Sequence, residues 1–400
     1  MSLAGAALND KDPYERYRRL RREDPVHYVP SIRGWFVLRY ADVVAMFKDA
    51  RLSSSISSMF FARLTPEQRA QMGDFERTLS LWMLLRDPPD HTRIKGMVLR
   101  AFTPRIVASL SPRVEAQVDE LLGAVDAAGE MDVIRDLAVP LPVLVIAELL
   151  GVPTSDRDRI KVWADDLARF MDSRPVAKHA AGDAHASFMA LDEYIKAIAD
   201  ERRRSPRDDL LSALVAPADG APPLQGDDLV ALSSLLLFAG HETTTNLIGN
   251  GMLALMRHPE ERARFIAEPS LAEPAIEELL RYDSPVQTVW RIATVDMELG
   301  GAAIKAGEMV FGVVASANRD DAQFPEPDRL DIGRKDVRHL SFGLGLHFCL
   351  GAALARLEGR IALRALLTRH AGIRLVTSSL QWSNHPSLRG VVSLPVQWGA

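Results

Sequence analysis

Apolar residues in the middle of the chain recur every three or four positions, which predicts a series of α-helices. Shorter runs rich in β-branched and aromatic residues lie near both ends of the chain and predict strands. The pattern therefore predicts a mainly α protein with a small β region. The expected helices are 105–127, 141–150, 154–171, 183–203 and 227–257, and the expected strands are 26–29, 35–39, 290–295, 297–304, 309–314, 373–376 and 391–396.

Turn and loop signals divide these segments without marking a domain border. Gly300-Gly301 is typical of a hairpin turn within the late β-like runs. The proline-rich stretch 216–226 predicts a loop between helices, because the composition on either side of it is the same. We therefore expect a single domain over residues 1–400, which is large enough to enclose a cofactor.

Composition excludes several classes of protein. The chain has 48 basic and 53 acidic residues, and the basic ones are dispersed, so nothing indicates a nucleic-acid partner. No window reaches the roughly 20 apolar residues of a membrane span, and the N-terminus lacks a signal-peptide pattern. A single cysteine excludes an intrachain disulfide and suits a reducing compartment. We expect a cytoplasmic monomer that does not bind membranes.

The one cysteine lies in an unusual glycine-rich segment, Phe342-Gly343-Leu344-Gly345-Leu346-His347-Phe348-Cys349-Leu350-Gly351. Helical spacing resumes after it, so Cys349 is predicted at a helix N-terminus, which favours a thiolate. A thiolate held by flexible backbone can ligate haem iron. Two other interpretations remain open: a small buried hydrophobic residue, or a nucleophile paired with His347.

Polar residues interrupt the apolar segment 227–257 at its centre. Ala239-Gly240-His241-Glu242-Thr243 is followed by two more threonines, a run that weakens and bends a helix. An acid beside a hydroxyl at such a point suggests a proton relay. The alternative is a partly exposed helix whose polar residues face water.

Together these two segments resemble the cytochromes P-450. Residues 342–351 match that family's haem-binding signature, Phe-x-x-Gly-x-x-x-Cys-x-Gly, and residues 239–243 match its oxygen-binding motif. The resemblance implies the cytochrome P-450 fold, a helical prism around buried haem b with minor sheets, and Cys349 as the iron ligand. It further implies that Thr243 hydrogen-bonds dioxygen and Glu242 supplies protons. The other implied haem contacts in these motifs are Ala239, Gly240, Phe342, Gly343 and Gly351.

Further positions match the family in the expected order. Glu278 and Arg281 are three apart on a predicted helix, a spacing that ordinarily means a surface ion pair. The resemblance instead implies a structural network with Arg329 that braces the cysteine loop. It also implies cations for the haem propionates. These are His91, Lys95, Arg291 and His347, with Lys95 departing from the arginine that is commoner at that position.

The resemblance implies a monooxygenase that inserts one atom of O2 into a hydrophobic molecule such as a terpenoid, steroid, fatty acid or polyketide. Electrons would come from a separate ferredoxin and its reductase, attracted by Arg100, Arg356 and Arg360. A peroxide-driven peroxygenase and a non-enzymatic haem sensor are the alternatives. Pocket candidates, each of which could instead be core, are Met59, Phe60, Phe61, Met83, Leu235, Phe238, Ala239, Val286, Val289 and Leu388.

Overall fold

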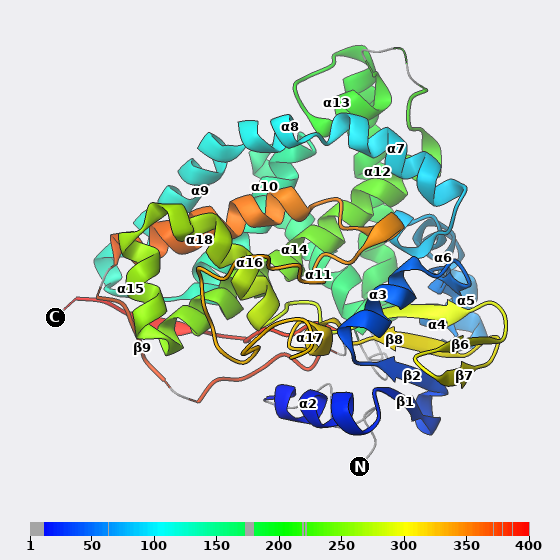
Figure 1. The fold of residues 1–400 in the computed structure, drawn as a ribbon. Coiled ribbons are helices and arrows are strands. Elements are labelled where there is room, and N and C mark those ends of the chain that lie inside the picture. The colour runs from blue at the N-terminus through cyan, green and yellow to red at the C-terminus, as the bar shows by residue number, and fades with distance from the viewer. Residues whose placement is uncertain are drawn as a thin grey trace. The chain divides into compact units, whose positions relative to one another are not determined.

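Helices make up most of the chain, and short strands occur towards both ends (Figure 1). The computed structural model describes residues 12–62, 64–172, 180–217, 220, 222–370, 372–377, 379–385 and 387–399. They fall into two compact units, each built from separate stretches of chain. Unit 1 comprises Met1–Ser53, Ala108–Leu141 and Glu242–Ala400, and unit 2 comprises Ser54–Val107 and Pro142–His241. The predicted mainly α architecture with a small β region is confirmed.

The main sheet of unit 1 joins the two ends of the chain. Its strand order is β1-β2-β8-β5-β3, and only the β2–β8 pair is parallel. Apolar side chains of the sheet pack against α3 around Val37, Val43 and Val310. The bounds are β1 Val26–Val29, β2 Gly34–Val37, β3 Leu52–Ser53, β5 Val289–Ala293, β8 Met309–Gly312 and α3 Tyr40–Lys48.

Two smaller sheets complete the β region of unit 1. β6 (Met297–Leu299) and β7 (Ala302–Ile304) form the predicted hairpin, with Gly300 and Gly301 at positive φ. β10 (Pro395–Gln397) pairs with both β4 (Glu130–Asp132) and β9 (Arg374–Leu375). The predicted strand 391–396 is largely wrong, because Val391 makes only an isolated bridge to Trp382.

The helices of unit 1 pack beside these sheets and against one another. α18 contacts α9, α15 and α16, while α17 contacts α2 and α3. The predicted helix 105–127 is divided into α8 and α9, because a proline at the start of α9 cannot continue the preceding helix. The bounds are α2 Tyr14–Glu23, α9 Ser111–Gly123, α15 Pro259–Ala267, α16 Ala272–Tyr282, α17 Val314–Ala317 and α18 Ala352–Arg369. α14 (Gly226–Arg257) begins in unit 2 and belongs to unit 1 from Glu242 onwards.

Unit 2 is almost entirely helical and has an aromatic core. α11 packs along α12, and Phe61 lies within 6 Å of both Phe75 and Phe170, measured between ring centroids. The remaining helices, in unit 2 or at its borders, are α4 Ser57–Phe61, α5 Pro66–Gln71, α6 Gly73–Ser80, α7 Asp90–Ala101, α8 Pro104–Ser109, α10 Pro140–Leu149, α11 Arg157–Asp172, α12 Ala180–Arg204 and α13 Leu210–Val215. Among the described residues, no helix is both long and apolar enough to cross a membrane.

Candidate functional site

The loop that carries Cys349 is held in a tight conformation by its own backbone. The N–H of Cys349 donates to the carbonyl oxygen of Phe342 at 2.9 Å, which closes the loop on itself. Gly343 and Gly345 have φ of +70° and +73°, values that side chains with a Cβ rarely adopt. Cys349 is exposed and lies three residues before α18. The predicted placement near a helix N-terminus is thus confirmed.

Side chains of neighbouring elements support this loop from outside. The guanidinium of Arg356, on the first turns of α18, lies 4.5 Å from the ring centroid of Phe342. The side-chain amide oxygen of Asn318 accepts from the N–H of Leu340, just before the loop. The loop also exposes large apolar side chains, since Leu346 and Phe348 are 54% and 44% exposed. The exposed sulfur of Cys349 therefore follows two exposed apolar residues in the chain, on a loop whose backbone is held at Cys349 and at Leu340.

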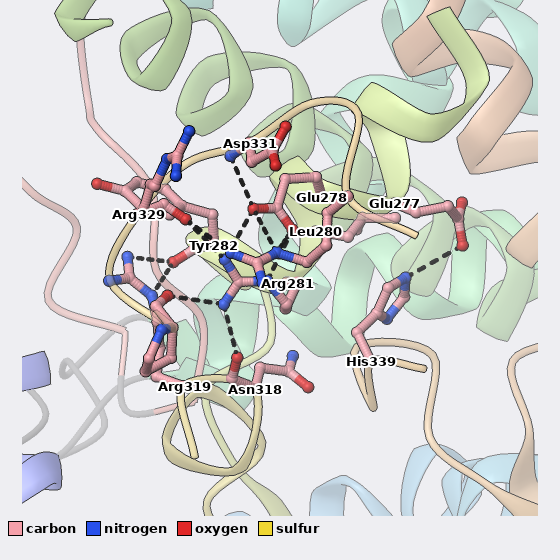
Figure 2. A network of polar contacts seen from close by, with 12 residues as sticks. Glu277, Glu278, Leu280, Arg281, Tyr282, Asn318, Arg319, Arg329, Asp331 and His339 are labelled. Atoms are coloured by element: carbon pink, nitrogen blue, oxygen red, sulfur yellow. Dashed lines mark hydrogen bonds and ion pairs between the residues drawn. The ribbon is translucent and has the colours of Figure 1, made fainter. Parts of the chain in front are cut away.

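A buried polar network lies on α16, and Figure 2 shows its members converging. Glu278 and Arg281 are both fully buried and form a bidentate salt bridge at 2.7 and 2.8 Å. Arg281 also donates to the backbone carbonyls of Asn318 and Pro327. Because these carbonyls belong to the segment leading to the cysteine loop, the network fixes that segment to α16. The pair is therefore buried and is not an ordinary surface ion pair, and its role in bracing the cysteine loop stays a prediction.

The prediction that the side chain of Arg329 is the third member of this network is wrong. The guanidinium of Arg329 is 62% exposed and lies 3.4 Å from Glu326, so only its backbone carbonyl accepts from Arg281. Arg334 takes the place expected for Arg329, because its Nε lies 3.2 Å from the Glu278 carboxylate and its side chain is 13% exposed. Sequence matching selected the wrong arginine because both lie in one irregular segment without periodicity.

Glu277 is a further supporting residue that the sequence analysis missed. Its carboxylate accepts from Arg356 at 2.6 and 2.8 Å and lies 3.3 Å from the imidazole of His339. Burial by itself would raise the pKa of Glu277, yet the bonds to Arg356 and His339 hold it at about 2. Arg356, expected to be free for an acidic partner, is therefore paired within the chain. Arg360 lies 3.9 Å from Glu273, so its charge is only weakly compensated.

The polar residues of α14 lie in a helix that runs unbroken from Gly226 to Arg257. Glu242 and Thr243 are half-buried in unit 1. The hydroxyl of Thr245 donates to the carbonyl oxygen of Ala138 at 2.8 Å, so this threonine ties α14 to another segment. In unit 2, a Cβ at Gly240 would lie 2.9 Å from Ile146, so the glycine also permits close packing of α10.

The other predicted haem and pocket residues are distributed over both units. Arg291 is buried in unit 1 and donates to the carbonyl of Trp290, and His347 is half-buried in the cysteine loop. His91 is buried and Lys95 half-buried on α7 of unit 2. Val286 and Leu388 pair in an isolated antiparallel bridge. Phe61 lies in the aromatic core of unit 2, whereas Met59 is exposed. The pocket candidates of unit 2 remain predictions: Met59, Phe60, Phe61, Met83, Leu235, Phe238 and Ala239.

Comparison with known proteins identifies the protein family of this chain. The profile of the cytochrome P-450 family matches residues 158–371. The chain is 42% identical to vitamin D(3) 25-hydroxylase of Pseudonocardia autotrophica, covering 97% of this chain and 94% of that protein. It is also 42% identical to cytochrome P-450 monooxygenase PikC of Streptomyces venezuelae, covering 97% and 91%. Its fold superposes on the crystal structure of P450BioI in complex with acyl carrier protein ligated to hexadec-9Z-enoic acid, with a TM-score of 0.88, 35% identity and coverage of 98% and 100%.

These comparisons identify the class of protein as a haem-containing oxidoreductase. The chain belongs to the cytochrome P-450 family, is a monooxygenase, and uses haem b. The residues of unit 1 fit this cofactor. An exposed thiol, exposed apolar neighbours and a buried arginine at position 291 suit a flat apolar ring whose iron accepts a thiolate ligand and whose edge carries carboxylates.

Proposed function

We propose that the chain hydroxylates or epoxidises a hydrophobic small molecule, with Cys349 as the ligand to haem iron. The overall reaction consumes the substrate, O2, two electrons and two protons and yields the oxygenated product and water. When bound, haem supplies the oxidising chemistry that no side chain provides. The observation that carries the proposal is the loop of Cys349, the chain's one cysteine. Its thiol is exposed, and the loop is closed by the hydrogen bond from the Cys349 N–H to the Phe342 carbonyl and braced from α16 and α18.

The chain's own residues have separate tasks in this proposal. Cys349 provides sulfur, and the bond from its N–H to Phe342 fixes where that sulfur lies. Thr243 and Glu242 hold and move protons on α14, an acid and an alcohol adjacent on one helix. Arg291 and His347 offer positive charge to the haem propionates in unit 1.

We further propose that substrate contacts in unit 1 come from Val286, Val289 and Leu388. All three are partly buried and apolar, and Val286 and Leu388 are held together by a β-bridge. One relative is named as a vitamin D(3) 25-hydroxylase, and another, P450BioI, was solved with acyl carrier protein ligated to hexadec-9Z-enoic acid. Both names support a large apolar substrate for this chain, such as a steroid-like molecule or a fatty acyl chain.

Electrons are proposed to come from a separate ferredoxin and its reductase. On α18, Arg360 is weakly compensated, since it lies 3.9 Å from Glu273, whereas Arg356 is paired with Glu277. We therefore expect Arg360→Gln to slow reduction by a ferredoxin several-fold at low salt and less at high salt. Arg356→Gln should instead disturb the cysteine loop itself.

The decisive experiment combines two spectra of the purified haem protein. The reduced carbon monoxide complex should show the red-shifted band of sulfur-ligated haem, and Cys349→His should abolish that band while haem stays bound. Titration with vitamin D3 and with free hexadec-9Z-enoic acid should then shift the ferric spin state for at least one of them. Loss of the band in the parent protein would end the proposal for Cys349. Turnover with hydrogen peroxide but none with O2 and a ferredoxin system would favour a peroxygenase.

A further inference from the structure

Two loops that carry proposed pocket residues are joined by very little regular structure. Val286 and Leu388 form an isolated antiparallel bridge, flanked by two backbone bonds. The N–H of Arg389 donates to the carbonyl of Pro285 at 2.8 Å, and the N–H of Gln287 donates to that of Ser387 at 2.7 Å. A pairing this short does not fix two loops by itself. Neighbouring side chains must therefore determine where the bridge lies.

One buried carboxylate connects both loops to the N-terminal helix. Asp283, at the end of α16, accepts from the Nε of Arg389 at 3.0 Å and from the hydroxyl of Tyr14 at 2.7 Å. The side chains of Arg389 and Asp283 are only 10% and 14% exposed. Charge-assisted bonds in such a setting are short and directional. We name the three residues Tyr14, Asp283 and Arg389 the loop clamp.

Arg389 is held from its other sides as well. Its guanidinium lies 3.6 Å from the ring centroid of Trp382, and its carbonyl oxygen accepts from the side-chain amide of Asn250 at 2.8 Å. A Cβ at the next residue, Gly390, would lie 1.8 Å from the side chain of Asn246. Asn246 and Asn250 both belong to α14. The clamp therefore fixes this loop against the helix that also carries Thr243.

The position of the clamp along the chain couples it directly to the pocket candidates. Arg389 is the residue after Leu388, and Asp283 lies three residues before Val286. A shift of either side chain is therefore transmitted to a lining residue through one to three peptide units. The cysteine loop is a separate segment, held by bonds at Phe342 and Leu340. Changes in the clamp should alter the pocket and leave the cysteine loop in place.

We propose that Asp283 and Arg389 are positioning residues that set the shape of the substrate pocket by fixing Val286 and Leu388. This inference rests on the proposed function, which assigns these two apolar residues to the pocket. Without the Asp283 carboxylate, the buried guanidinium of Arg389 would lose the counter-charge bonded to it at 3.0 Å, and it would turn towards solvent. Leu388 would follow, and small displacements of this kind have large effects on binding and turnover.

The test uses two iron-binding azoles of different size on the haem protein, so it does not depend on knowing the substrate. Imidazole reports access to the iron alone, and 4-phenylimidazole also contacts the surrounding apolar wall. Asp283→Asn and Arg389→Lys should each raise the Kd for 4-phenylimidazole about tenfold while that for imidazole changes less than twofold. Leu388→Ala should act in the same direction. Tyr14→Phe should give about a threefold change.

The matched control is Arg18→Gln, because Arg18 lies on the same helix as Tyr14 but pairs with Asp328 instead of the clamp. Its azole affinities should equal those of the parent, and every variant should retain the carbon monoxide band. If both azoles weaken equally, or neither changes, the positioning role is overturned. Should Asp283→Asn yield no haem protein, Arg389→Lys and Tyr14→Phe decide the question. If the parent binds 4-phenylimidazole no more tightly than imidazole, the apolar pocket itself is wrong, and the inference with it.

Discussion

Two buried glutamates of unit 1, one on α16 and one on α18, have opposite surroundings. Glu278 is fully buried and bonds to Arg281, Arg334 and the N–H of Asp331. Glu358 is 1% exposed, and among the described residues its Oε2 has no hydrogen-bond partner. Burial raises the pKa of Glu358 to about 8. Burial alone accounts for the raised pKa of Glu358, whereas Glu278 has two arginines and a backbone N–H as hydrogen-bond partners.

The largest effect is expected where the charged network is broken. Glu278→Gln leaves Arg281 and Arg334 buried without their shared counter-charge, which should lower the free energy of unfolding by about 3–5 kcal/mol. Denaturant unfolding measures this, with Glu277→Gln on the same helix as the control. A Glu278→Gln protein as stable as its parent would show that the network is not needed for the fold.

Glu358 should make the free energy of unfolding fall as the pH rises into the alkaline range. Because its folded pKa of about 8 lies above the ordinary 4.5, the folded state retains a proton that the unfolded state has lost between these values. Stability from this group is therefore complete below about pH 4.5 and is lost as the pH rises through about 8.

Replacing this acid with a neutral amide separates it from other titrating groups. Glu358→Gln should unfold at nearly the same denaturant concentration as the parent near pH 5 and be more stable by about 4 kcal/mol near pH 9. The difference between the two unfolding curves, followed from pH 5 to pH 9, provides the measurement. A difference that does not change with pH would mean that Glu358 is charged when folded.

The two arginines near Glu278 should differ although both lie in one loop segment. Arg334→Ala removes the bond to Glu278 and one to the carbonyl of Pro325, so a loss of about 2 kcal/mol is expected. Arg329→Ala removes a side chain that is 62% exposed, and should cost less than about 0.5 kcal/mol. Thermal unfolding of the two variants side by side compares them. Equal losses of stability in the two variants would mean that the side chain of Arg329 does belong to the network.

A smaller loss of stability than at Arg334 is expected at the partly exposed neighbour, Glu277. Its pKa of about 2 lies below 4.5, so its contribution is present above about pH 4.5 and is lost as the pH falls towards 2. Glu277 is 28% exposed, and solvent screening limits the loss in Glu277→Gln to about 1 kcal/mol at pH 7. The difference in unfolding free energy between variant and parent should narrow as the pH falls from about 5 to about 2.5, and a constant difference would contradict the pairing with Arg356.

Local patterns in the sequence predicted the elements whose signals are periodic or contained in a few residues. The helix over 227–257, the hairpin at Gly300-Gly301 and the cysteine loop all follow from spacing and from glycine chemistry. The division of 105–127, the short strand near the C-terminus and the exchange of Arg329 for Arg334 did not. The division of 105–127 has a local cause, the proline at the start of α9, whereas contacts with distant segments decide the strand and the choice of arginine.

By itself the sequence determined the class of protein, because both motifs are short and continuous along the chain. One is the cysteine among glycines in 342–351, and the other is the acid beside an alcohol in 239–243. Only the tertiary structure decided which charges are partners. Glu278 meets Arg334 from 56 residues away, and Asp283 meets Arg389 from 106. The strength of such pairs depends on distance and desolvation, and neither quantity exists until distant parts of the chain have packed together.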